Sequence, residues 1–331
     1  MNIKKIHSRK IDRVLDPRRK NYSFIARIFR WINRHCDYHR VILNISALVG
    51  ICLFFIFSPV IGKIPGQSRP IVKAAFVFEP KLPTSLGKAL PPLSAHGVFV
   101  MDLESGTILY DKNPHLRLKP ASLTKIMTSI VALDYFTEDD ILKVQNGQNS
   151  IGNTADLVTG DELNASDVLY ALLVPSGNDA AVTLAENYPG GYGAFLERMN
   201  QKVVQLGLKN THFVNVSGLE SPNHYTSAFD IAMIARSALN RLTFTNIVST
   251  KKITVNSLKG HKYPLLSTNV LLSHPDVLGV KTGWTPEAGE CLVILTEREG
   301  HKVLISILNS KDRFGEGRQL IDWTYNNFNW Q

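Results

Sequence analysis

Near the N-terminus, residues 41–62 form an uninterrupted apolar segment, VILNISALVGICLFFIFSPVIG, that contains no Asp, Glu, Lys or Arg. A segment of this length and apolarity can cross the ~30 Å hydrocarbon layer of a bilayer as a single helix. We therefore expect one transmembrane helix at 41–62, which divides the chain into an N-terminal part and a longer C-terminal part.

The charge distribution predicts the orientation of this helix. The 331-residue chain has a net charge of +9, and residues 1–40 account for all of it, with twelve Lys and Arg against three acids. Positively charged flanks remain in the cytoplasm. We expect a single-pass protein of the cytoplasmic membrane, with its N-terminus inside and its C-terminal domain extracytoplasmic.

Two other interpretations of the N-terminus are weaker. A cleaved signal peptide seldom has a basic leader this long, and no small-residue cleavage pattern follows closely. A nucleic-acid partner is not needed, because anionic lipid headgroups attract the same basic residues. We expect contact with membrane lipid through the anchor and no nucleic acid.

Composition then suggests four parts: a basic cytoplasmic tail at 1–40, the transmembrane helix at 41–62, a proline-rich linker at 63–95 and a folded domain at 96–331. The linker segment contains six prolines, which favour an extended spacer. Only Cys291 falls in the domain, so no disulfide can close within it.

Within the domain, strand patterns come first and last, and helical patterns fill the middle. GVFVMDLESGTILYDKN predicts a hairpin, in which we expect Asp102 and Glu104 to be solvated. Apolar residues recur at helical spacing in PASLTKIMTSIVALDYF. Ser166 is a candidate cap for a later helix, and strands return at 277–310. We expect a sheet that pairs the first strands with the last.

Ser122 and Lys125 lie at the start of that helical pattern. Positions i and i+3 share a face of a helix, so the two side chains can touch. A serine hydroxyl becomes a useful nucleophile when a neighbouring base removes its proton. Burial and nearby positive charge can lower the pKa of a lysine enough to make it that base. A single S-x-x-K pair is nevertheless common by chance.

Two further motifs strengthen the pair. Residues 176–178 are Ser-Gly-Asn at a break between two helical patterns, and residues 281–283 are Lys-Thr-Gly at the end of a strand pattern. The motifs S-x-x-K, S-x-N and K-T-G, separated by 54 and 105 residues, occur in this order in penicillin-binding proteins and class A β-lactamases.

With these motifs, residues 90–331 resemble the D-alanyl-D-alanine carboxypeptidases, the low-molecular-mass penicillin-binding proteins. The stretches HFVNVSGLESPNHYTSAFDIAMIAR and KTGWTPEAGECLV belong to the resemblance. It implies a penicillin-binding/β-lactamase-like α/β domain, in which helices flank a mainly antiparallel sheet and a helical lobe lies between its first and last strands.

The resemblance also implies catalytic roles. Ser122 would be the nucleophile that is acylated, Lys125 its general base, and Ser176 the relay that passes a proton to the leaving amine. The backbone N–H groups of Ser122 and Trp284 would form the oxyanion hole. No metal or other cofactor is implied.

Substrate-binding roles follow from the same resemblance. Asn178 would hold a peptide amide, and Lys281 and Thr282 would bind the terminal carboxylate of D-alanine or of a β-lactam. Gly283 would allow the backbone to approach the ligand closely. The implied partners are peptidoglycan stem peptides, with β-lactam antibiotics as covalent inhibitors.

We therefore expect a serine D-Ala-D-Ala carboxypeptidase. A DD-endopeptidase that cleaves cross-links shares every one of these residues, and the short segment after K-T-G matches the layout of such enzymes. A β-lactamase is a weaker alternative, since no convincing E-x-x-x-N box lies between Ser176 and Lys281. The intact motif residues argue against a non-catalytic wall-binding protein.

Overall fold

The computed structural model describes residues 81–147 and 150–330. The basic tail, the expected transmembrane helix at 41–62 and most of the expected linker lie outside the described residues. No helix within the described ranges combines the length and the apolarity needed to cross a bilayer.

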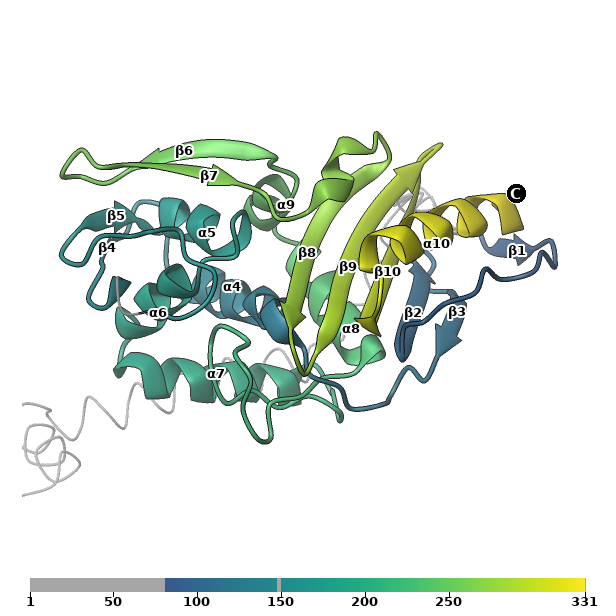
Figure 1. Cartoon of the computed structure of the whole chain (residues 1–331), viewed down its shortest axis with the longest axis horizontal. Coiled ribbons are helices and arrows are strands. Elements are labelled where there is room, and N and C mark those ends of the chain that lie inside the picture. The colour runs from purple at the N-terminus through teal and green to yellow at the C-terminus, as the bar shows by residue number, and fades with distance from the viewer. Residues whose placement is uncertain (1–80, 148–149, 331) are drawn as a thin grey trace, which may run out of the picture. The chain divides into compact units, whose positions relative to one another are not determined.

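A five-stranded antiparallel sheet organises the domain, in the order β3-β2-β10-β9-β8 (Figure 1). The strands are β2 (Gly97–Asp102), β3 (Ile108–Lys112), β8 (Val277–Thr285), β9 (Gly289–Arg298) and β10 (His301–Ser310). The antiparallel pairing of β2 with β10 confirms the predicted closure of the sheet by its first and last strands. Among the strands that the structure describes, β8 lies at one edge of this order and pairs with β9 alone.

Helices cover both faces of the sheet. On one face, α10 (Arg313–Asn327) contacts β9 and β10 and buries Leu320 and Ile321 against them. On the other face, α8 (Ala228–Leu239) contacts β2 and β10. The strand β2 is therefore buried along its whole length.

A helical lobe lies between the first and last strands, as predicted. Its helices are α4 (Thr124–Tyr135), α5 (Ala165–Leu173), α6 (Asn178–Glu186), α7 (Gly191–Gln205) and α9 (Leu242–Val248). Two small hairpins and a 3-10 turn complete the elements around it: β4 (Ile141–Lys143) with β5 (Glu162–Asn164), β6 (Lys252–Asn256) with β7 (Lys262–Leu266), and η3 (Val270–Ser273).

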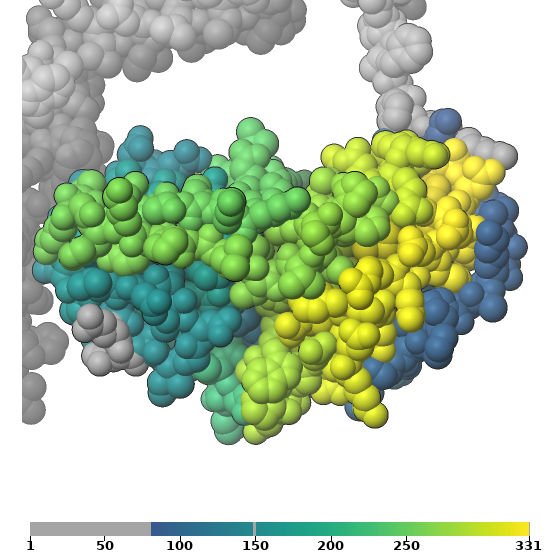
Figure 2. All heavy atoms as spheres, turned by 45° about the horizontal axis from the view of Figure 1, so that its top comes forward, coloured from purple at the N-terminus to yellow at the C-terminus, as the bar shows by residue number. Residues whose placement is uncertain are grey.

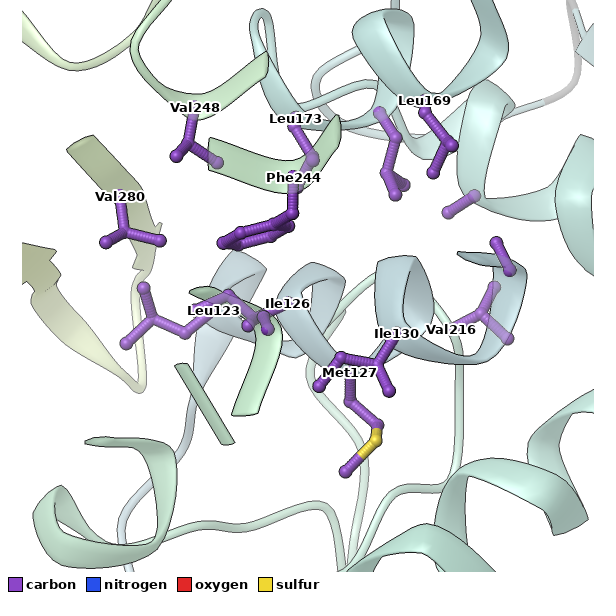
Figure 3. Packing of buried hydrophobic residues seen from close by; sticks show 14 of the residues in the cluster. Leu123, Ile126, Met127, Ile130, Leu169, Leu173, Val216, Phe244, Val248 and Val280 are labelled. Carbon is purple, nitrogen blue, oxygen red and sulfur yellow. The ribbon is translucent and has the colours of Figure 1, made fainter. Parts of the chain in front are cut away.

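The helix α4 forms the centre of the lobe. Figure 3 shows Leu169 and Leu173 of α5 and Phe244 of α9 on one side of α4, and Met127 of α4 projecting on the other side; all of these side chains are buried. This burial on several sides fixes the position of the first turn of α4. The predicted cap Ser166 is wrong, because Asn164 is the N-cap residue of α5 and Ser166 lies inside the helix.

The first described residues pack on the domain. The strand β1 (Pro83–Ser85) pairs with β11 (Phe328–Trp330), and Figure 2 shows this N-terminal segment in blue against the C-terminal segment in yellow. Ala95 is fully buried. Contacts with the domain thus begin ahead of the expected boundary at His96, within the segment expected to be a linker.

The hairpin between β2 and β3 also differs from expectation. Asp102 was expected to be solvated, but it is buried and accepts hydrogen bonds from the Ser105 backbone and from Trp330 Nε1. The prediction was wrong because Trp330, which covers this carboxylate, lies at the other end of the domain sequence.

Candidate active site

The turn that carries Ser122 is tightly held. Ser122 lies in η1 (Ala121–Leu123), a 3-10 turn that leads directly into α4. The backbone at Gly218 packs against this turn. A Cβ added at Gly218 would lie only 1.9 Å from the Ala121 carbonyl oxygen. Gly218 also has a φ of +93°, which a glycine adopts without strain. Ser122 is therefore presented at a fixed place at the start of α4.

Lys125 is fully buried beneath Ser122. Its Nζ lies 3.1 Å from Ser122 Oγ, 2.6 Å from Asn178 Oδ1 and 2.7 Å from the Ser217 carbonyl oxygen. Burial, followed by the charge of Lys281, holds the pKa of Lys125 well below its usual value, against an opposing effect of Asp179. This lowered pKa favours the uncharged amine form of Lys125.

An uncharged amine has two N–H donors and one lone pair. Asn178 Oδ1 and the Ser217 carbonyl can accept hydrogen bonds but cannot donate them, so they take both donors. The lone pair of Lys125 is then left for the remaining neighbour, Ser122 Oγ. This arrangement allows the amine to accept the hydroxyl proton.

The Asn178 side chain is fixed at the start of α6. Its Nδ2 donates to the Ile151 carbonyl at 2.5 Å, and its backbone N–H donates to the Asn153 carbonyl at 2.7 Å. The donation by Nδ2 orients the amide so that Oδ1 faces Lys125. The segment at 151–153 therefore controls the geometry of the lysine.

Ser176 lies in the break between α5 and α6, as the sequence predicts. It is a buried non-glycine residue with a φ of +70°. Its Oγ has no hydrogen-bond partner among the residues that the structure describes. A buried hydroxyl without a partner is costly, which makes Ser176 available for a bound group.

The strand β8 forms the opposite wall. Lys281 is buried behind this wall, where its Nζ donates to the Thr282 carbonyl at 3.2 Å. Burial, followed by the charge of Arg313, lowers the pKa of Lys281 to about 7. The hydroxyl groups of Thr282 and Thr268 lie 2.6 Å apart. The Thr282 side chain lines the cleft between the two walls, whereas the Lys281 side chain is buried beneath the surface of the cleft.

A cleft of about 550 Å³ separates the two walls. Trp284 stands at its edge with 59% of its surface exposed. The residues lining the cleft are Ser122, Gly152, Asn153, Ser176, Asn178, Ser217, Gly218, Leu219, Thr268, Thr282, Gly283, Trp284, Thr285, Pro286, Glu290 and Arg313. The structure brings six of the eight sequence-predicted site residues to the cleft, with Lys125 and Lys281 buried just beneath its surface.

The sequence motifs did not identify Arg313. Its Nη1 donates to the Gly283 carbonyl at 2.9 Å, and its Nε has no partner in the described part of the chain. Arg313 is the first residue of α10, outside any of the three motifs, so only the fold reveals it. It gives the cleft a permanent positive charge.

We searched the described residues for side chains that could bind a metal ion. Across residues 81–147 and 150–330, no group of three or more His, Cys, Asp or Glu side chains could hold a metal ion. His224, which lies within the stretch HFVNVSGLESPNHYTSAFDIAMIAR, is buried, and its Nε2 lies 2.8 Å from Thr124 Oγ1.

The sequence model for D-alanyl-D-alanine carboxypeptidases of peptidase family S11 matches residues 85–312. The chain belongs to this family. The D-alanyl-D-alanine carboxypeptidase DacF of Bacillus subtilis is 32% identical over 71% of this chain, and DacD of Escherichia coli is 35% identical over 72%. The chain spans 63% and 65% of the lengths of these two family members.

Solved structures of the family agree with the fold. The Streptomyces K15 DD-transpeptidase superposes with a TM-score of 0.69 at 31% identity, over 72% of this chain and 100% of that one. An evolved penicillin-binding protein homolog from Mycobacterium tuberculosis gives 0.68 at 27% identity, over 73% and 96% of the chains. The predicted penicillin-binding/β-lactamase-like α/β fold is confirmed.

Proposed function

We propose that this protein is a serine D-Ala-D-Ala carboxypeptidase that removes the terminal D-alanine of peptidoglycan stem peptides through an acyl-enzyme. The observation that carries the proposal is the 3.1 Å contact between Ser122 Oγ and the buried Lys125 Nζ, an amine whose pKa is held well below its usual value. The match to the carboxypeptidase family over residues 85–312 supports the same reaction.

In the first step, Ser122 Oγ attacks the carbonyl carbon of the scissile peptide bond while Lys125 takes the hydroxyl proton. The oxyanion that forms is stabilised by the backbone N–H groups of Ser122 and Trp284. The close approach of Gly283 to the Ser122 nitrogen supports a shared hole between the two backbones.

In the second step, the C–N bond breaks and the leaving D-alanine needs a proton on its amine. Ser176 supplies the path for it, because its buried hydroxyl has no other partner within the described ranges. The proton originates from the Lys125 ammonium. Water then attacks the ester carbonyl while Lys125 accepts a proton from this water, and Lys125 returns the proton to Ser122 Oγ as the ester bond breaks.

The terminal carboxylate of the substrate is held at the β8 wall. Thr282 offers a hydroxyl, and Lys281 and Arg313 supply two positive charges around it. The oppositely charged carboxylate also stabilises the protonated form of Lys281. Asn178 and Gly283 complete the binding of the peptide backbone. A β-lactam carries the same carboxylate and a reactive amide, so it acylates Ser122 as a covalent inhibitor.

The decisive test uses a fluorescent penicillin followed by mapping of the labelled peptide. The label is expected on Ser122 and is expected to disappear in Ser122→Ala. A label on any other residue, or on Ser122→Ala, would refute the assignment of the nucleophile.

DD-endopeptidase activity is the second candidate. A D-alanyl-D-alanine endopeptidase of Pseudomonas aeruginosa is 33% identical to this chain over 76% of its own length. Mass spectrometry of products from a defined pentapeptide and from a cross-linked muropeptide separates the two. Loss of D-alanine from the pentapeptide supports the carboxypeptidase, whereas cleavage confined to the cross-link supports the endopeptidase.

We also propose that residues 41–62 anchor the protein in the cytoplasmic membrane, with the basic tail 1–40 inside and the domain outside. The charge-free segment and its basic flank support this topology. Fractionated cells and protease added from outside provide the test. Full-length protein found wholly in the soluble cytoplasmic fraction would contradict it.

A further inference from the structure

Asp179 is a fully buried carboxylate in the first turn of α6. Three backbone N–H groups donate to it, those of Ala155, Leu157 and Ala180, at 2.9–3.0 Å. No ion pair involving Asp179 occurs within the described residues. A buried charge held only by backbone donors is costly to keep, so its position calls for an explanation.

The segment that Asp179 holds is a wall of the cleft. Ala155 and Leu157 lie two and four residues after Asn153, which lines the cleft together with Gly152. The neighbouring residue Asn178 holds the front of the same segment, through the carbonyl groups of residues 151 and 153. Two consecutive residues of α6 therefore fasten the segment 151–157 at both of its ends.

We propose that Asp179 is a positioning residue for the reaction at Ser122. Its buried carboxylate fixes the segment 151–157, the segment fixes the Asn178 amide, and that amide takes one of the two N–H groups of Lys125. The inference rests on the proposed function, because it assigns a consequence for acylation of Ser122.

Asp179 also acts on Lys125 through its charge. The pKa of Lys125 is lowered first by burial and then by Lys281 on β8, and Asp179 on α6 opposes both. Replacing the carboxylate by an amide removes this opposition, so the pKa of Lys125 falls further. The pKa of Asp179 itself is raised by burial and, against the three N–H donors, also by Asp156. At low pH the acylation rate falls as Lys125 becomes protonated. This fall is called the low-pH limb of the rate profile, and it is therefore expected to move to lower pH in Asp179→Asn.

Asp230 provides a matched control. It is a buried carboxylate in the first turn of α8, and it holds another chain segment by accepting from Asn210 N and Thr211 Oγ1. It does not line the cleft. Asp230→Asn thus has the same chemistry and a comparable structural cost without any link to Lys125.

The experiment measures the second-order rate of acylation by fluorescent penicillin from pH 4 to pH 9, with thermal unfolding of each variant. Asp179→Asn is expected to acylate at least about tenfold more slowly, with its low-pH limb shifted to lower pH. Asp230→Asn is expected to keep the wild-type rate and profile. Equal rates and profiles for the two variants would overturn the inference.

If Asp179→Asn does not fold, Asp179→Glu decides the same question. It keeps the charge but displaces the carboxylate, so the rate is expected to fall while the low-pH limb stays in place. A wild-type rate in Asp179→Glu would overturn the positioning role. Wild-type protein that is not acylated at Ser122 would instead overturn the proposed function, and the inference with it.

Discussion

Gly283 lies so close to Ser122 that a Cβ added to the glycine would stand 3.1 Å from the Ser122 backbone nitrogen. The same Cβ would meet the Pro120 carbonyl oxygen and the Ala121 side chain at the same distance. The strand β8 is therefore in direct contact with the turn that carries Ser122. A methyl group at position 283 would fit between them only if one of them moved.

Gly283→Ala is expected to separate this wall from the turn by a few tenths of an ångström. The two backbone N–H groups of the proposed oxyanion hole would then no longer converge, and acylation should slow by up to ~10²–10³, the loss seen when one such donor is removed. Penicillin acylation rates test this, with circular dichroism to confirm the fold. An acylation rate equal to that of the wild type would mean that the oxyanion hole is not formed by these two N–H groups.

The pH dependence of kcat/KM is expected to reflect Lys281. Its pKa of about 7 in the free enzyme means that its positive charge is present below pH 7 and lost above it. Because kcat/KM reports the free enzyme, it should decline as pH rises through about 7 for substrates with a terminal carboxylate. A substrate with an amidated terminus should show no such decline. A flat profile up to pH 9 with both substrates would contradict the role of Lys281.

Arg313→Ala is expected to reduce acylation by carboxylate substrates by one to two decades. A charge-assisted hydrogen bond is worth about 1.5–3 kcal/mol, and about 1.4 kcal/mol corresponds to one decade. The change also removes the cation that lowers the pKa of Lys281, so the decline in kcat/KM should move to higher pH. Rate measurements on the acid and the amide test this, and equal losses on both substrates would show that Arg313 does not bind the carboxylate.

Asp161 is expected to stabilise the domain through a cluster at the β6–β7 hairpin. His261 Nδ1 lies 2.8 Å from its carboxylate, and Tyr263 Oη donates to it. Burial raises the pKa of Asp161, but hydrogen bonds from Tyr263, His261 and Ser257 outweigh this effect and lower it. Asp161→Asn should lower the free energy of unfolding by about 1–3 kcal/mol at pH 7.

The sign of the pH effect follows from the lowered pKa. The contribution of the Asp161 charge is fully present above the unfolded value of ~3.9 and is lost as pH falls through the folded value. Urea unfolding of wild type and Asp161→Asn should therefore differ at pH 7 and converge below pH 4. Asp111→Asn, at an exposed carboxylate, serves as the control and should show little difference at either pH. If wild type and Asp161→Asn still differ as much in free energy of unfolding at pH 3 as at pH 7, the charge of Asp161 is not the source of the stabilisation.

The sequence alone predicted the features that are set by residues close together in the chain. Helical spacing located α4, and the shared face of positions i and i+3 correctly placed Lys125 against Ser122. The order of the strand patterns predicted the pairing of β2 with β10. The cap of α5 was missed, because single residues at helix boundaries are poorly determined by sequence.

Contacts between distant segments could not be predicted in this way. Asp102 is buried by Trp330, Lys125 donates to the carbonyl of Ser217, and Arg313 enters the cleft from α10. None of these residues has a distinctive local sequence that marks its partner. Each joins its neighbours only after the sheet and the helical lobe have assembled.

The pairing of β2 with β10 has a consequence for the way the chain acquires its structure. The two strands lie near opposite ends of the domain sequence, so a large loop must close before they meet, and this makes folding slow. Until β10 emerges, β2 presents apolar side chains on both faces and an unpaired edge. A nascent chain is therefore prone to aggregate at β2, and productive folding must wait until nearly the whole domain is available.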